Sequence, residues 1–277
     1  MGHEGGESAY VDLNGHLTQF LRAEVRADSE EPNAAYWEEN WSGVDEPQLR
    51  HALRPTKRLG THGGFFRRHL PTGCRILEAG CGTGFWMQRL RQNGYEVYGL
   101  DYACDSLKRS KSLVSDLDLC AGNLLGLPFQ ENSFDAYMSF GVIEHFIDGP
   151  GPILREALRV LRPGGVILAS TPFLNTARKA VSRIAKEEAE ARGLRFHQYF
   201  FTLAELNHEF EAAGFEALGD SATYSVWHGL QDAAPAWRAR LSRVPMMSRL
   251  AYALDFVPGL GQRAAHMIFA VGRKPSR

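Results

Sequence analysis

The chain has 277 residues, a formal net charge of −1, 44% hydrophobic residues and 23% charged residues. This balance excludes intrinsic disorder and argues against nucleic-acid binding through bulk positive charge. No stretch reaches the roughly 18 apolar residues of a membrane-spanning helix, and the first residues lack the basic start and apolar core of a signal peptide. The four cysteines form no C-x-x-C pair, so we expect reduced thiols and a cytoplasmic protein.

The first 70 residues stand apart by their charge. Acidic residues prevail from Glu4 to Glu46, whereas seven Lys or Arg and no Asp or Glu lie between Arg50 and Arg75. This basic stretch either meets an anionic substrate or RNA, or forms the solvated face of an entry helix. We expect residues 1–70 to form a helical cap and residues 71–277 to form the second, larger domain.

From residue 75 onward, short apolar runs alternate with helical segments. The expected strands are 75–79, 96–101, 117–121, 135–140, 165–170, 216–224 and 266–272. The expected helices between them include 106–115, 152–161 and 203–213. Such alternation predicts an α/β fold, a doubly wound and mostly parallel sheet with helices on both faces.

Two further helical features are expected in the second half of the chain. Residues 175–192 are predicted to form one inserted helix. Thr202 with Glu205 three residues later predicts a capping box at the start of the helix over 203–213.

A glycine-rich segment, Glu78-Ala79-Gly80-Cys81-Gly82-Thr83-Gly84, follows the first of these strands directly. Glycines there let the backbone turn tightly and approach a ligand with no side chain between them. The spacing G-x-G-x-G differs from the dinucleotide pattern G-x-G-x-x-G, because Phe85 stands where the last glycine would be. The segment therefore argues against a pyrophosphate ligand, and a purely structural turn is the alternative.

Three more motifs follow in order. Asp101 ends the second strand, where a carboxylate can accept both hydroxyls of a ribose. Asn123 stands in Gly122-Asn123-Leu124-Leu125-Gly126-Leu127-Pro128-Phe129, beside apolar residues that suit an adenine ring. The fourth motif is Arg159-Val160-Leu161-Arg162-Pro163-Gly164-Gly165.

Taken together, residues 70–215 resemble the class I S-adenosylmethionine-dependent methyltransferases, most closely the broad family of ubiquinone and menaquinone biosynthesis methyltransferases. The resemblance implies a seven-stranded sheet whose last strand is antiparallel, and S-adenosylmethionine as the methyl donor. The family usually has Asp where this chain has Asn123, which can still accept a hydrogen bond.

The resemblance also implies a cofactor site. Its implied residues are Glu78, Gly80, Cys81, Gly82, Gly84, Asp101, Tyr102, Asn123, Leu124 and Phe140. Aromatic residues that could shield the sulfonium are Tyr36, Trp37, Trp41 and Trp86, although each could equally be core.

On the acceptor side, relatives that methylate ubiquinone precursors carry E-x-x-E-H after the fourth strand and bind a metal. Here the stretch begins with Gly141, and only Glu144 and His145 remain, so we expect no catalytic metal. His145 and His197 are the candidate general bases, because the pKa of a histidine lies near the working pH. The alternative for each is a structural role. Tyr36, Trp37 and Tyr199 are the candidate acceptor contacts.

Two insertions, at about 172–200 and 225–265, are expected to form lids over the cofactor edge of the sheet. The apolar content of the second suggests a sizeable apolar acceptor or a dimer contact. Contact with lipid headgroups is a weaker alternative, based on four arginines: Arg238, Arg240, Arg243 and Arg249.

We therefore expect a methyltransferase that acts on the O, N or C atom of a small-molecule acceptor that is sizeable and partly apolar. The alternatives are an RNA or protein methyltransferase and a catalytically silent partner subunit. Nucleic acid is the less expected partner, and the protein is expected to be a monomer or a homodimer.

Overall fold

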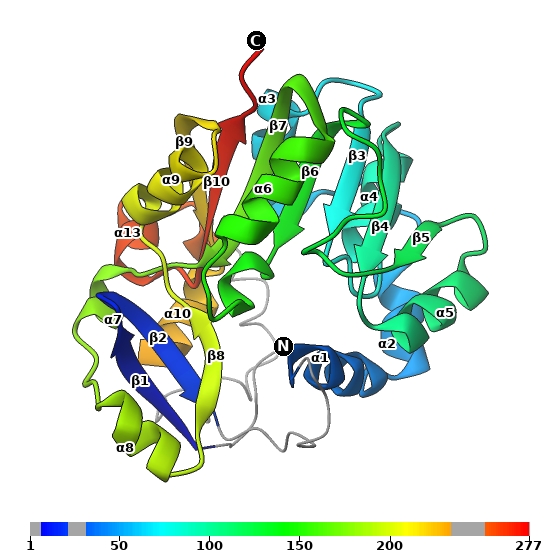
Figure 1. The fold of residues 1–277 in the computed structure, drawn as a ribbon. Helices are drawn as coiled ribbons and strands as arrows, with labels where there is room; N and C mark the ends of the chain where they lie inside the picture. Colours follow the sequence, from blue (N-terminus) through cyan, green and yellow to red (C-terminus); the bar gives the residue numbers. More distant parts are fainter. Residues whose placement is uncertain (1–6, 22–31, 234–252, 277) are drawn as a thin grey trace.

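The computed structural model describes residues 7–21, 32–233 and 253–276, and its centre is one seven-stranded sheet (Figure 1). In chain order the strands are β3 (Arg75–Ala79), β4 (Glu96–Asp101), β5 (Asp118–Ala121), β6 (Phe134–Phe140), β7 (Leu161–Pro172), β9 (Glu216–Tyr224) and β10 (Met267–Arg273). Their spatial order is β5-β4-β3-β6-β7-β10-β9. All neighbours are parallel except that β10 runs antiparallel to both β7 and β9. The predicted fold class, with an antiparallel last strand, is confirmed.

Helices cover both faces of this sheet. Those nearest the strands are α3 (Gly63–His69), α4 (Phe85–Gln92), α5 (Cys104–Leu113), α6 (Gly151–Val160) and α9 (Leu203–Ala212). The predicted capping box of α9 is present, because Thr202 Oγ1 accepts from the Glu205 amide and the Glu205 carboxylate accepts from the Thr202 amide.

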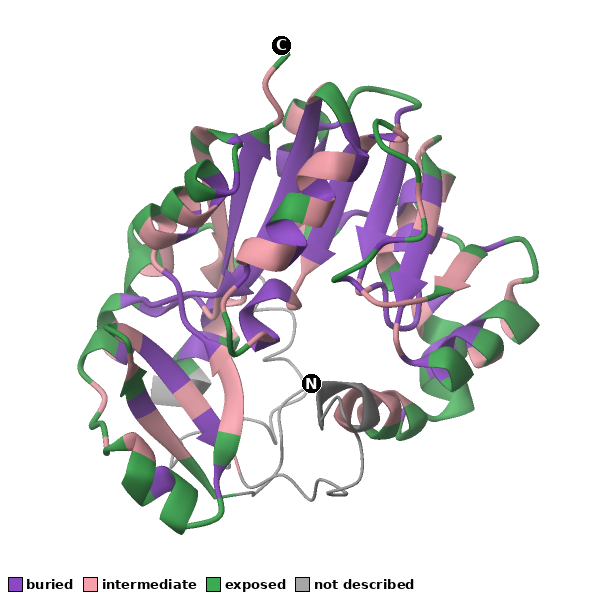
Figure 2. Ribbon diagram, in the orientation of Figure 1, coloured by how far each residue is buried: buried purple, intermediate pink, exposed green. Residues whose placement is uncertain are grey.

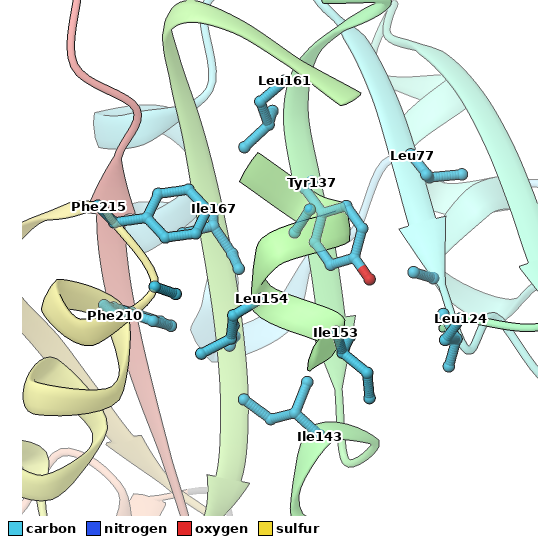
Figure 3. Close-up of a cluster of buried hydrophobic side chains, with 14 of the residues drawn as sticks. Leu77, Leu124, Tyr137, Ile143, Ile153, Leu154, Leu161, Ile167, Phe210 and Phe215 are labelled. Atoms are coloured by element: carbon cyan, nitrogen blue, oxygen red, sulfur yellow. The ribbon is translucent and has the colours of Figure 1, made fainter. Parts of the chain in front are cut away.

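Alternate residues of the strands feed two separate cores. Successive strand side chains point to opposite faces, so Leu77 packs toward α6 and α9 whereas its neighbour Ile76 packs toward α3 and α4. Figure 3 shows the first core, where Ile153 and Leu154 of α6 and Phe210 of α9 gather over the sheet. The central strands β3, β4, β6, β7 and β10 are accordingly mostly buried, whereas the edge strands β5 and β9 are half-buried or exposed (Figure 2). Burial of the central strands fixes the strand ends that carry the site.

A second, smaller sheet lies beside the first. It is antiparallel, with the order β1 (Ser8–Leu13), β2 (His16–Leu21) and β8 (Arg195–Tyr199), so it joins the N-terminal hairpin to the insertion after β7 (Figure 1). The expectation of a helical cap is therefore wrong for residues 8–21. The signal for the hairpin was Asn14-Gly15, whose φ angles of 54° and 86° suit a two-residue turn between paired strands.

The rest of the N-terminal part is helical. It contains α1 (Pro32–Ser42), α2 (Glu46–Ala52) and the 3₁₀ turn η1 (Gly60–His62). The boundary between cap and larger domain at residue 70 stays a prediction.

The inserted helix expected over 175–192 is also wrong in part. The segment forms two short helices, α7 (Thr176–Lys179) and α8 (Lys186–Ala191). Between them Ile184 pairs with Val11 and donates its amide to the Tyr10 carbonyl at 3.0 Å. The backbone around Ile184 therefore pairs with the edge strand β1 and does not continue the helix, because an edge strand offers unpaired hydrogen-bonding groups.

The second insertion contains α10 (Val226–Ala233) and α13 (Leu260–Ala264). Residues 234–252, which include the four arginines considered for lipid contact, lie outside the described residues. One more turn, η2 (Ile143–His145), follows β6 and completes the elements around the site.

Candidate active site

A cavity enclosing about 520 Å³ of space, part of it open to solvent, lies at the carboxyl ends of β3, β4 and β6. Its lining residues are Trp37, Trp41, Gly80, Asp101, Tyr102, Leu124, Phe140, Gly141, Val142, His145 and Phe146. Ligands of open α/β sheets bind at this edge. Five of the ten residues implied for the cofactor line the cavity, together with Trp37 and His145 from the acceptor side.

The glycine loop needs its glycines for two reasons. Gly80, Gly82 and Gly84 have φ angles of 78°, 51° and 76°, which side-chain-bearing residues rarely adopt. A Cβ on Gly80 would lie 2.4 Å from Val142 Cγ2, and a Cβ on Gly82 would lie 2.6 Å from Trp41 Cζ2. The loop is therefore packed against side chains that line the same cavity.

Asp101 ties the end of β4 to this loop. Its Oδ2 accepts from the Gly82 amide at 2.7 Å, and its Oδ1 accepts from the Ala103 amide at 2.9 Å. Burial raises the pKa of the Asp101 carboxyl, and these hydrogen bonds oppose that effect. The carboxylate is thus held rigidly in the cavity wall, where it can accept from ligand hydroxyls.

Glu78, at the base of the loop, carries a buried carboxyl group whose hydrogen bonding is incomplete. Only 4% of the residue is exposed, and its Oε2 has no hydrogen-bond partner among the described residues. Burial raises the pKa of Glu78 to about 8, although a hydrogen bond from the Met87 amide lowers it and the nearby Asp101 raises it further. Such a group suits a ligand that brings positive charge, because an opposite charge favours the ionised carboxylate.

The other implied residues of this half take different positions. Cys81 is buried, and burial raises the pKa of its thiol well above the usual range, so the thiol stays neutral. Asn123 Oδ1 accepts from the Leu125 amide at 2.7 Å, which shapes the turn that places Leu124 in the cavity wall. Phe140 lines the cavity, and its ring stacks on Phe66 at a centroid distance of 5.8 Å.

Helix α1 supplies two indoles to the cavity. Trp37 and Trp41 lie one helical turn apart and stack at a centroid distance of 6.2 Å. The Trp37 ring meets the His145 ring edge to face at 4.9 Å. One wall therefore runs continuously from the glycine loop, past Trp41 and Trp37, to His145.

His145 is held in one orientation. Its Nδ1 lies 2.7 Å from the His197 carbonyl oxygen. Because a carbonyl only accepts, Nδ1 carries the hydrogen and Nε2 is the acceptor nitrogen of the neutral ring. The Nε2 atom lies 3.9 Å from Glu144 Oε1, and burial raises the pKa of Glu144 to about 8.

The remaining acceptor-side candidates lie around this histidine. The His197 ring packs 4.8 Å from the His145 ring and 5.6 Å from the Tyr36 ring. Burial raises the pKa of Tyr36 to about 12, so its phenol stays protonated. Tyr199 is 7% exposed, donates its hydroxyl to the Ile147 carbonyl at 2.7 Å, and is not among the residues that line the cavity.

Two residues that line the cavity, Val142 and Phe146, were not among the residues implied for the site. They lie there because they follow directly from β6, and position after a parallel strand was the only clue to them. Gly141, which the sequence motif had singled out, also lines the cavity, and Glu144 of the same motif is buried.

No group of three or more His, Cys, Asp or Glu side chains able to hold a metal ion occurs within residues 7–21, 32–233 and 253–276. Within the same part of the chain, no helix is long and apolar enough to cross a membrane.

Comparisons with known sequences agree with this geometry. A family described as "Methyltransferase domain" matches residues 77–169. The chain is 36% identical over 162 residues to a probable S-adenosylmethionine-dependent methyltransferase of Mycolicibacterium smegmatis, a match that covers 58% of each chain. It is 30% identical over 224 residues to the ubiquinone biosynthesis O-methyltransferase of Xanthomonas axonopodis, covering 77% of this chain and 88% of that one.

A third relative, the demethylmenaquinone methyltransferase of Renibacterium salmoninarum, is 37% identical over 99 residues, which are 35% of this chain. The matched stretches thus span only 58% and 41% of the Mycolicibacterium and Renibacterium proteins.

Among solved structures, the Burkholderia thailandensis 1,6-didemethyltoxoflavin-N1-methyltransferase, bound to 1,6-didemethyltoxoflavin and S-adenosylhomocysteine, has a TM-score of 0.53. It is 20% identical, covering 97% of this chain and 99% of that one. The cyclase SpnF has a TM-score of 0.57 at 18% identity, covering 92% of this chain and 100% of its own. These structures share the fold, and fold alone does not fix the reaction.

Proposed function

Because this chain belongs to the class I S-adenosylmethionine-dependent methyltransferases, we propose that it transfers a methyl group to a small, partly apolar molecule in the cavity beside His145. The observation that carries the proposal is the continuity of that cavity. The glycine loop, Asp101 and His145 line one space, so a donor and an acceptor can meet there.

The cofactor fits the first half of the cavity. Gly80 of the glycine loop lines the cavity, and Asp101 offers carboxylate oxygens to ribose hydroxyls. The unpartnered Oε2 of Glu78 suits the positively charged amino group of the methionine part. When bound, S-adenosylmethionine supplies a methyl group already activated by its positive sulfur.

The protein's task is then to position the acceptor and manage one proton. A positioned acceptor converts a bimolecular step into an effectively unimolecular one, which can supply most of the rate. For a hydroxyl acceptor, Nε2 of His145 takes the proton, because Nδ1 is committed to the His197 carbonyl. Trp37, packed against the His145 ring, keeps water from that side of the imidazole.

Two observations support a small acceptor. Two of the relatives named above are, by their names, an O-methyltransferase of ubiquinone biosynthesis and a demethylmenaquinone methyltransferase, and the Burkholderia enzyme holds a small heterocycle. The walls around His145 are mainly aromatic, from Trp37, Phe140 and Phe146. Such walls suit a partly apolar molecule.

An RNA acceptor has less support. In the basic stretch between residues 50 and 75, Arg50 pairs with Glu46, Arg68 with Asp220 and Arg75 with Glu96. These carboxylates compensate charge that phosphate contacts would require. A silent partner subunit is also less supported, because the glycine loop and Asp101 are intact. A cytoplasmic location and a monomeric or homodimeric state stay predictions.

The test is a transfer assay with the whole chain. The purified protein is incubated with labelled S-adenosylmethionine and separate panels of phenols and quinols, amines, bulk RNA and unrelated proteins. We expect label in a small hydroxyl- or amine-bearing molecule, lost in the Asp101→Ala variant. Label in RNA or protein, and in no small molecule, would contradict the proposal.

A further inference from the structure

We propose that Arg109, on α5, is a positioning residue for the cofactor. It lines no part of the cavity and instead clamps α1, so that Trp37 and Trp41 close over the glycine loop. This inference rests on the cavity being the cofactor site, and it adds a residue that neither the sequence motifs nor the comparisons single out.

The Arg109 guanidinium donates hydrogen bonds to carbonyl oxygens at and just beyond the C-terminal end of α1. Its Nη1 donates to the Trp41 carbonyl at 3.2 Å and to the Ser42 carbonyl at 3.3 Å, and its Nη2 donates to the Val44 carbonyl. The last carbonyls of a helix have no partner within the helix and carry its negative dipole end. A planar, permanently charged fork is therefore well suited to this end, and a lysine is less so.

A second contact joins the same two helices one turn earlier along each of them. Glu38 of α1 accepts from the Asp105 amide, in the first turn of α5, at 2.9 Å. That amide lies just after Asp101 and Ala103, the pair that fixes the ribose-side carboxylate. Helix α5 thus holds α1 at two points and is itself continuous with the cofactor wall.

The clamped helix delivers a specific contact to the cofactor loop. The Trp41 indole lies so close to Gly82 that a Cβ there would be 2.6 Å from its Cζ2. Figure 1 shows α1 lying beside α5, below the carboxyl edge of the sheet. Among the described elements, α1 packs most closely against α5.

The consequence is thermodynamic. If the cofactor binds fully only when α1 is closed, the apparent dissociation constant equals the intrinsic one divided by the closed fraction. Loss of the Arg109 clamp lowers that fraction without touching any cofactor contact. A fall of the closed fraction to about one tenth would raise the apparent dissociation constant about tenfold.

The experiment measures binding of S-adenosylhomocysteine by calorimetry to the whole chain and to the Arg109→Gln variant. Hydrogen–deuterium exchange of the peptides that contain residues 36–44 is recorded with and without the ligand, and thermal melting reports on folding. The matched control is Lys108→Gln, which removes one positive charge from the neighbouring position of α5, where Lys108 forms an exposed ion pair with Asp105.

We expect Arg109→Gln to bind about tenfold more weakly, with faster exchange in residues 36–44 that S-adenosylhomocysteine largely reverses. Lys108→Gln should match the wild type. Arg109→Lys should lie between the two, and it provides the measurement should Arg109→Gln fail to fold. Wild-type affinity in an Arg109 variant whose α1 exchanges faster, or equal weakening by Lys108→Gln, would overturn the inference. Because no methyl transfer is measured, these outcomes are independent of the acceptor.

Discussion

Glu78 offers the sharpest test of the cofactor half of the site, through the change Glu78→Gln. The side chain is buried, its Oε2 has no partner among the described residues, and burial raises its pKa to about 8. The cofactor's amino group stabilises the ionised carboxylate, so binding should release the proton that Glu78 holds in the free protein. Glutamine keeps the shape and has no proton to release.

The size of the effect follows from the pKa. With a pKa of about 8, the ionised fraction of Glu78 is about 1% at pH 6.0 and about 24% at pH 7.5. Affinity for S-adenosylhomocysteine should therefore rise about 24-fold over this range, because only the ionised form pairs with the ammonium. At pH 7.0, about 0.9 proton should leave the protein for each ligand bound.

Calorimetry in buffers of different ionisation enthalpy measures both the affinity for S-adenosylhomocysteine and the number of protons released on binding. In Glu78→Gln we expect affinity to be weaker than in the wild type at both pH values, to vary little with pH, and to involve almost no proton release. Glu144→Gln is the matched control, because burial also raises the pKa of Glu144 to about 8 but its carboxyl lies beside His145. It should keep the wild-type slope.

The pH dependence of folding stability gives an independent check on the raised pKa of Glu78. The pKa of Glu78 is higher in the folded state than its unfolded value of about 4.3. The contribution of Glu78 to the free energy of unfolding is therefore fully present below pH about 4.3 and is lost as pH rises toward about 8. Wild-type affinity that is flat with pH, or a Glu78→Gln variant that keeps the full slope, would refute the assignment of Glu78 to the amino group.

Further changes test the rest of the site. Asp101→Ala should weaken S-adenosylhomocysteine binding by about 1.5–3 kcal/mol, measured by calorimetry, because it removes a charged hydrogen-bond acceptor. Gly82→Ala should abolish detectable cofactor binding and lower the melting temperature, because the added Cβ meets Trp41 at 2.6 Å at a φ of 51°. His145→Ala should lower kcat about 10²–10⁴-fold on a hydroxyl acceptor while cofactor affinity stays unchanged. Methyl transfer should survive a chelator. Loss of activity that magnesium restores would contradict the inference that Gly141, in place of a carboxylate, leaves the enzyme without a catalytic metal.

Local sequence was sufficient for the large sheet and the cofactor loop. Strand patterns depend on residues close together in the chain. The predicted strands match β3, β4, β5, β6, β9 and β10 closely, and β7 is longer than predicted. The glycines of the loop act through their own φ angles, and Asp101 follows its strand directly. Such features are set by neighbours in the chain, so they can be read from it.

The small sheet was harder to foresee because its strands come from distant segments. The Asn14-Gly15 turn was a local signal for the hairpin. No local pattern in Arg195–Tyr199 indicates that this segment pairs with β2. Likewise, the helical pattern of residues 175–192 is interrupted at Ile184 because the edge of β1 is present, a fact of tertiary structure.

The methyltransferase fold and the conformation of the glycine loop can be derived from the sequence, because both depend on contiguous residues with fixed spacing. The geometry of the acceptor side and of the helix that covers it depends instead on how distant segments pack. The tautomer of His145 depends on a carbonyl 52 residues away, at His197. The position of Trp41 over Gly82 depends on Arg109, more than 60 residues further along the chain. Contacts of this kind arise from how the elements pack, and no local pattern in the sequence encodes them.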